Sequence, residues 1–186
     1  KLMLIKNFFF CLILLFLWSC NSDVQPKPEA YLRLKYEKPN YKTIKTGSNF
    51  SFQHNTSAQL KISKNKSLQL IYPDMKATLY MNYNSVEENI DSLLTDAYQL
   101  PFKHISKAES IPEKIFINNK KKVYGTLFSV VGDAASQFQF FLTDSVNHFL
   151  VGSVYFYARP NYDSLFPAIK FLEKDLFHLI ETFEWK

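Results

Sequence analysis

The sequence predicts an α+β domain with a central antiparallel sheet, helices packed on that sheet and a long C-terminal helix. Short stretches between residues 50 and 83 alternate apolar and polar side chains, which is the period of strands. The period becomes helical after Ser85 and again after Asp163. Strands return between these two helices, so the order is not the repeated βαβ pattern of a parallel doubly wound sheet.

The first twenty residues have the pattern of a bacterial lipoprotein signal peptide. A basic start precedes an apolar run over 8–18, which is too short to cross a bilayer because a spanning helix needs roughly 20 apolar residues. Cys20 follows the small residue Ser19, as in a lipobox, where the cysteine becomes the diacylated first residue. We therefore expect a signal peptide over 1–19 and a lipid on Cys20. The alternatives are an ordinary signal peptide with a coincidental cysteine and a membrane-spanning anchor.

The remaining chain is expected to form a tether over 20–30 and one domain over 31–186. Pro26 and Pro28 favour an extended tether, and the domain is long enough to bury a core. Both cysteines of the chain lie within its first twenty residues, so the domain has no thiol for a disulfide or a metal site. The formal charge of +5 falls to about +3 if Lys1 and Lys6 leave with the signal peptide, which is mild. The basic run over 120–122 reads as a hairpin turn, with a nucleic-acid or lipid patch as the alternative.

The first half of the domain is expected to be mostly strands. Residues 31–36, which include Arg33, alternate as a strand or as an edge segment laid on the domain, and 38–49 are polar enough for a loop. An antiparallel meander then follows from Phe50 to Tyr83. Ser85 and Glu88 have the spacing of a capping box, which predicts a helix start at Ser85. Pro101 ends or kinks this helix, and 102–109 is a candidate second helical piece.

The second half contains further strands and the final helix. Residues 148–158 carry apolar side chains on both faces, which predicts a central strand. The last helix is expected to start with a cap at Asp163 or Ser164, with Pro167 in its first turn. A broad apolar stripe ends at Phe183, and Trp185 is expected to plug the core. The other strands are expected over 115–117, 123–131 and 137–143.

The chemistry-bearing residues do not form a catalytic pattern, and no enzyme activity, metal or cofactor is expected. The four histidines lack metal-ligand spacing. Ser136 with His148 and Asp133 is a conceivable triad, but Ser136 precedes a strand rather than the helix of a nucleophile elbow. A hydrolase that uses Ser136 is therefore kept only as a weaker hypothesis.

Two segments at strand ends combine aromatic, amide and arginine side chains, a composition that suits protein–protein contact. They lie over 132–139 and 157–163, and the alternative is that they merely connect elements. The residues predicted to bind a partner are Arg33, Asp133, Ser136, Gln137, Tyr157, Arg159 and Asn161. An alternative function is the binding of a small or polymeric envelope ligand on the aromatic strand face at Tyr155 and Tyr157.

Several long strings of the sequence match a known family. They include Pro26-Lys27-Pro28-Glu29-Ala30, Tyr72-Pro73-Asp74-Met75, Gly132-Asp133-Ala134-Ala135-Ser136-Gln137 and Tyr157-Ala158-Arg159-Pro160-Asn161-Tyr162-Asp163. Over essentially its whole length the chain resembles GldD, the gliding-motility lipoproteins of the Bacteroidetes. The order of elements is also similar to the Mog1/PsbP-type α/β/α sandwich, which is an analogy of pattern alone.

The resemblance implies a non-enzymatic envelope lipoprotein required for gliding and for the type IX secretion machinery. Its expected partners are the membrane, through the lipid on Cys20, and other envelope proteins of that machinery; neither nucleic acid nor metal is expected. Asn21 after the lipidated cysteine favours the outer membrane, with the domain facing the periplasm, and the inner membrane is the alternative.

Overall fold

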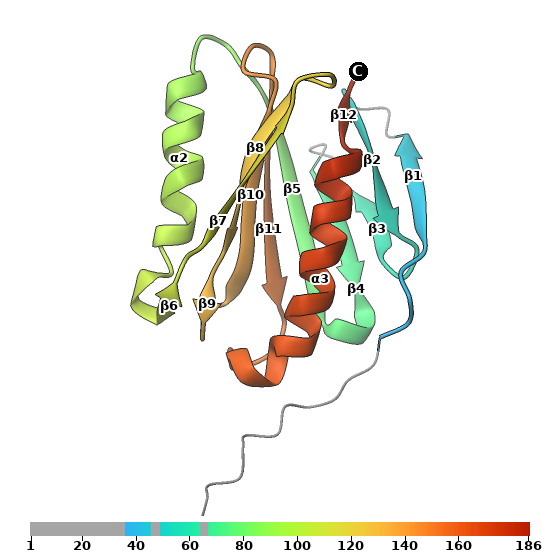
Figure 1. Cartoon of the computed structure of the whole chain (residues 1–186), viewed down its shortest axis with the longest axis vertical. Coiled ribbons are helices and arrows are strands. Elements are labelled where there is room, and N and C mark those ends of the chain that lie inside the picture. Colours follow the sequence, from blue (N-terminus) through green and yellow to red (C-terminus); the bar gives the residue numbers. More distant parts are fainter. Residues whose placement is uncertain (1–35, 46–48, 64–66) are drawn as a thin grey trace, which may run out of the picture. The chain divides into compact units, whose positions relative to one another are not determined.

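The computed structural model describes residues 36–45, 49–63 and 67–186. The predicted signal peptide, Cys20, the tether, Arg33 and residues 31–35 of the first expected strand therefore lie outside the described residues. The main feature of this part is a seven-stranded antiparallel sheet (Figure 1). From one edge to the other, its strands are β3 (Gln59–Ile62), β4 (Leu68–Tyr72), β5 (Ala77–Ser85), β11 (His148–Phe156), β10 (Ser136–Thr143), β8 (Val123–Ser129) and β7 (Glu113–Asn118). The predicted α+β class is confirmed.

One helix packs on each face of this sheet. Successive side chains of a strand point to opposite faces. On β10, Phe140 belongs to the core under helix α3 (Tyr162–Thr182), whereas its neighbour Phe141 belongs to a second core under helix α2 (Ile90–Phe102). Figure 1 shows the two helices on either side of the strands. The layers are therefore α/β/α, and β11, in the middle of the strand order, is the central strand that the sequence predicts.

Helix α3 supplies much of the larger core. Its buried apolar residues recur at helical spacing and pack against the sheet. Asn161 caps the helix, because its Oδ1 accepts a hydrogen bond from Ser164 N at 3.0 Å. The prediction of Asp163 or Ser164 as the cap is wrong, and Pro167 lies in the second turn rather than the first. The buried apolar residues are Ala168, Ile169, Leu172, Leu176, Leu179 and Ile180.

A small sheet stands beside α3 and completes this layer. Its order is β1 (Tyr41–Lys45), β2 (Phe50–Asn55) and β12 (Glu184–Trp185). Strand β1 lies where a loop was expected, and β2 pairs with β1 and β12 rather than joining the predicted meander. Only β3, β4 and β5 form that meander, since each pairs with the next.

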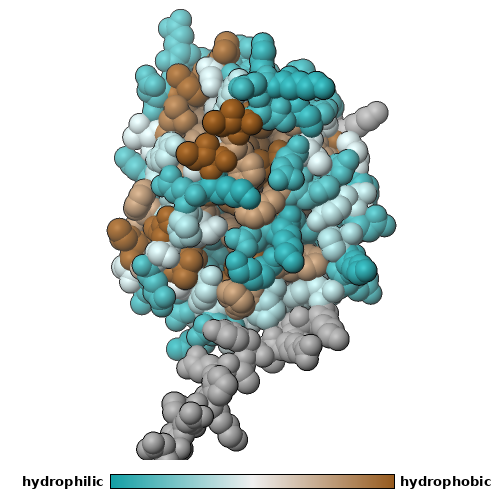
Figure 2. All heavy atoms as spheres, in the orientation of Figure 1, coloured by the Kyte–Doolittle hydropathy of each residue, from teal (hydrophilic) through white to brown (hydrophobic). Residues whose placement is uncertain are grey.

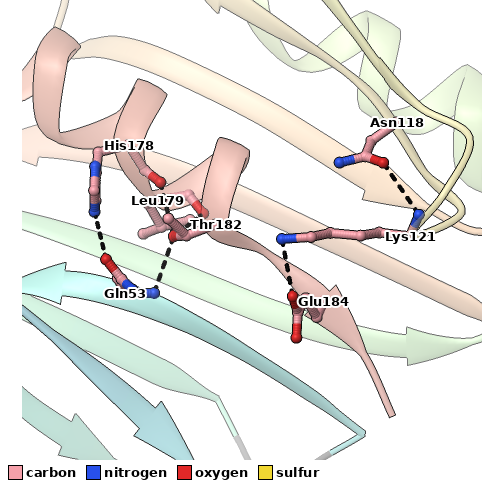
Figure 3. Close-up of polar contacts among 7 residues, drawn as sticks. All are labelled: Gln53, Asn118, Lys121, His178, Leu179, Thr182 and Glu184. Atoms are coloured by element: carbon pink, nitrogen blue, oxygen red, sulfur yellow. Dashed lines mark hydrogen bonds and ion pairs between the residues drawn. The ribbon is translucent and has the colours of Figure 1, made fainter.

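Polar contacts join the C-terminal end of α3 to β2, and join β12 to the β7–β8 hairpin (Figure 3). The backbone N–H of Gln53 donates to Thr182 Oγ1 at 3.1 Å, and His178 Nε2 lies 2.8 Å from Gln53 Oε1. Lys121, in the hairpin turn, forms an ion pair with Glu184 at 2.9 Å. The basic run is thus a hairpin turn, as predicted. Trp185 packs edge-on against Phe183 and plugs this end of the core.

The first helix begins later than the capping box predicts. Strand β5 continues to Ser85, and Glu88 has a left-handed φ of 56°, so Ser85 is not a helix cap. Asn89 occupies the N-cap position of α2. Pro101 lies inside the last turn, and the expected second helical piece is only a short 3-10 turn. The remaining elements are η1 (Pro73–Met75), η2 (Ile105–Lys107), β6 (Ala108–Ser110) and β9 (Val131–Gly132).

Candidate interaction surfaces

The structure brings the two predicted segments together at one end of the sheet. The backbone N–H of Tyr162 donates to Asp133 Oδ1 at 2.8 Å, which ties the segment after β9 to the first turn of α3. A carboxylate at a helix N-terminus is favourable, because it accepts from a free N–H and faces the positive end of the helix dipole. Asp133 and Asn161 are therefore both engaged in shaping the start of α3.

Two of the predicted contact residues are buried. Ser136 is 0% exposed and its Oγ donates to Phe138 O at 3.4 Å. Gln137 is also buried, and its Nε2 donates to the carbonyls of Gly132 and Ala134. These side chains hold the segment in shape and do not face solvent, whereas Asp133 and Asn161 are exposed.

The conceivable Ser136 triad is not assembled. Ser136 pairs with Tyr155 near one end of β11, while His148 begins that strand seven residues earlier. Seven residues of a strand span roughly 23 Å, so the histidine cannot take a proton from the serine. His148 instead lies 2.7 Å from the hydroxyl of Tyr83 and stacks on Trp185.

A tyrosine-rich part of the sheet face on the α2 side remains open to solvent. Tyr157 is 61% exposed and hydrogen-bonds through its hydroxyl to that of Tyr80 on β5. Tyr155 packs edge-on against Tyr80, with ring centroids 6.0 Å apart. Gln69 and Ser153 flank Tyr80 in the strand register. Arg159 is exposed just beyond, so the predicted aromatic face is a surface that a ligand can reach.

An apolar groove lies at the other side of the same face, between α2 and the edge strand β7. We call it the α2–β7 groove. Ile115 and Ile117 are 68% and 70% exposed, although both are large aliphatic side chains. The groove has a volume of ≈300 Å³. Figure 2 shows apolar atoms gathered over this region of the molecule. The main lining residues are Ile90, Leu94, Tyr98, Ile115, Ile117 and Tyr124.

The groove exists because α2 covers only part of the sheet. The helix packs over Phe128, Phe141 and Phe149, which lie on the inner strands β8, β10 and β11. Strand β7 is the last strand of the sheet, so its residues on this face extend beyond the helix. Contiguous exposed apolar surface of this kind marks sites of interaction in soluble proteins.

Sequence reasoning treated 115–117 only as a strand and did not identify this groove. One signal in the sequence could have identified it. This short strand carries apolar side chains on both faces, whereas an edge strand needs only one apolar face to pack on a core. Phe116 fills the core side by packing against Phe177. The isoleucines on the other face then need a cover that the described part of the chain does not supply.

The described residues offer no metal site and no membrane span. No group of three His, Cys, Asp or Glu side chains within 36–45, 49–63 and 67–186 is placed to hold a metal ion. Over the same residues, no helix is both long and apolar enough to cross a membrane.

Fold and surface together define a class: a layered α/β/α domain with an apolar groove and an aromatic sheet face open to solvent. Residues 21–185 match the model of the family described as gliding motility lipoprotein GldD. The chain belongs to this family, which is one of envelope-associated lipoproteins linked to motility. A search of curated proteins found no matching sequence.

Proposed function

We propose that this protein is a membrane-anchored envelope lipoprotein that gliding motility and the associated type IX protein secretion machinery require. It acts as an assembly component through protein–protein contacts and performs no catalysis. The family supports the link to gliding. The observation that carries the contact role is the α2–β7 groove, where Ile115 and Ile117 expose aliphatic surface.

The anchor of this proposal is the lipid on Cys20. The lipobox-like sequence before Cys20 and the family both favour it. Asn21 favours the outer membrane, with the domain in the periplasm, and the inner membrane is the alternative. A domain held in this way meets its partners in two dimensions, which raises their effective concentration without any further contact.

Charged substitutions in the groove test the contact role. Ile115→Lys and Ile117→Lys place an ammonium group where a partner would bury apolar surface, and burial of an unpaired charge costs several kcal/mol. Because both positions are exposed, we expect the free energy of unfolding to change by no more than about 0.5 kcal/mol. Colony spreading and the amount of secreted protein should fall sharply in both variants.

Ile62→Lys is the matched control, since Ile62 is 56% exposed on the opposite edge strand, β3. This variant should glide and secrete as the unmodified protein does. Normal motility and secretion in the groove variants, at normal protein levels, would show that the α2–β7 groove is not the contact surface.

A second candidate function is the binding of a small or polymeric envelope ligand on the aromatic sheet face. The exposed rings of Tyr155 and Tyr157 favour it, because aromatic rings offer stacking surface and hydroxyl groups to a ligand. Co-sedimentation with purified peptidoglycan sacculi, compared between the unmodified protein and Tyr157→Ala, measures this. Equal sedimentation of the two proteins would rule out this face as the binding surface for that polymer.

A further inference from the structure

In the edge strand β7, the backbone N–H and C=O groups of every second residue point away from the sheet. Ser129 N donates to the carbonyl of Pro112 at 3.0 Å, which fixes the hydrogen-bonding phase between this segment and β8. In an antiparallel pair, hydrogen-bonded residues alternate with residues whose N–H and C=O point outward. Counting from Pro112 along the register, Lys114 and Phe116 bond to β8. The outward positions are Glu113, Ile115 and Ile117.

The same positions carry the exposed side chains of the α2–β7 groove. Ile115 lies opposite Thr126, and Ile117 lies opposite Tyr124, both of which line the groove. A strand added along β7 would therefore pair with outward backbone groups and place alternate side chains beside the two isoleucines. An edge that no described strand covers, beside an apolar groove, is the combination that recognition by strand addition uses.

Charges at the two ends of β7 define the chemistry of the added strand. Lys120 and Lys122 are exposed in the hairpin turn at one end, while Lys121 is already paired with Glu184. Glu113 is exposed at the other end. An occupant is favoured if it carries an acidic residue beside the turn, because opposite charges steer encounter and fix register.

We propose that β7 binds an extended segment of a partner protein by strand addition. The segment has apolar side chains at alternate positions, which enter the α2–β7 groove, and an acidic residue at the end beside Lys120 and Lys122. This inference rests on the proposed contact function and specifies how the contact is made.

The test uses the full-length lipidated protein in nanodiscs and a phage-displayed library of random decapeptides. Selected peptides should alternate apolar and other residues and carry an acidic residue at one end. The affinity of one selected peptide is then measured for Ile115→Ala and Ile115→Pro. Both variants lose the side chain, but only proline removes the outward N–H, which an edge strand tolerates. Affinity should fall at least tenfold further in Ile115→Pro than in Ile115→Ala.

Ile62→Pro is the matched control, because Ile62 also lies at an outward position. The hydrogen bond from Ser63 N to Ser67 O sets this phase on β3. The affinity of Ile62→Pro for the peptide should equal that of the unmodified protein. Amide hydrogen exchange provides a second readout that needs no substitution: exchange at Ile115 and Ile117 should slow when the peptide binds, and exchange at Ile62 should not.

Three results would overturn the inference. The first is that the library yields no peptide that binds this protein better than it binds an unrelated protein in nanodiscs. The second is equal affinity of Ile115→Pro and Ile115→Ala, with no slowing of exchange on β7. The third is a dimer that Ile115→Pro dissociates, which would make a second copy the occupant. If the lysine variants still abolish gliding in the second case, the contact function stands and only strand addition fails.

Discussion

Asp175 is a carboxylate on α3 that is only 4% exposed. Its oxygens accept from Tyr41 OH at 2.8 Å and Asn55 Nδ2 at 2.9 Å, so it joins the helix to β1 and β2. Burial raises the pKa of Asp175 above its ordinary value of 3.8, although these hydrogen bonds oppose the shift. Burial, together with the hydrogen bond to Asp175, also raises the pKa of Tyr41.

The raised pKa predicts how stability depends on pH. The folded state holds the Asp175 proton more tightly than the unfolded chain does, so this group's contribution is greatest below pH 3.8 and is lost as pH rises through the folded-state pKa. Urea unfolding measures the free energy of unfolding of the unmodified protein and of Asp175→Asn. Between about pH 4 and pH 7, the unmodified protein should lose stability relative to the variant. Parallel stability curves for the unmodified protein and Asp175→Asn would contradict the account.

Individual side-chain roles were the least predictable from the sequence. Asp133 and Asn161 were predicted to contact a partner, yet both support the start of α3. Asn161 does so through a local contact with Ser164, whereas Asp133 accepts from Tyr162 N–H, a contact that depends on the tertiary fold. Ser136 and Gln137 look polar and therefore exposed, but the chain buries them and satisfies Gln137 Nε2 with local carbonyls. The sequence likewise does not reveal the burial of His54, which is 1% exposed and whose ring nitrogens have no hydrogen-bond partner among the described residues.

Helix α3 is the element that most of the core depends on, and truncation of its buried face should be costly. Leu172 is buried against the sheet. Leu172→Ala leaves a cavity, and we expect the free energy of unfolding to fall by about 2–5 kcal/mol. Lys174→Ala, on the exposed side of the same helix, should change it by no more than about 0.5 kcal/mol. Chemical denaturation measures both, and similar values for the two would contradict the packing described for α3.

Alternation of apolar residues predicted most strands correctly, because most strands of the sheet have at least one face in a core. Local signals failed where tertiary pairing decided the outcome. Ser85 and Glu88 fit a capping box, but pairing of β5 with β11 extends the strand to Ser85. Residues 41–45 look like a loop and become β1 because β2 offers a pairing edge. The α2–β7 groove depends on where α2 ends relative to β7, which periodicity does not encode.

At the scale of the whole molecule, the account predicts that location and function are linked. Cys20→Ala should prevent lipidation and release the protein from the membrane fraction. Colony spreading should be lost at the same time, because a soluble domain no longer meets its envelope partners at high effective concentration. Fractionation followed by immunoblotting measures the first effect and colony spreading the second. Full motility with a soluble, unlipidated protein would separate the function from the anchor.

The central claim is that a partner covers the α2–β7 groove in the cell, and thiol labelling tests it most directly. The chain has two cysteines, Cys11 and Cys20, both within the predicted leader and lipidation site, so a cysteine introduced into the domain is a specific probe. We predict that Ile117→Cys reacts rapidly with a small maleimide in the purified protein and at least tenfold more slowly in intact cells. Ile62→Cys should react equally fast in both. Equally rapid labelling of Ile117→Cys in cells and in purified protein would contradict the claim.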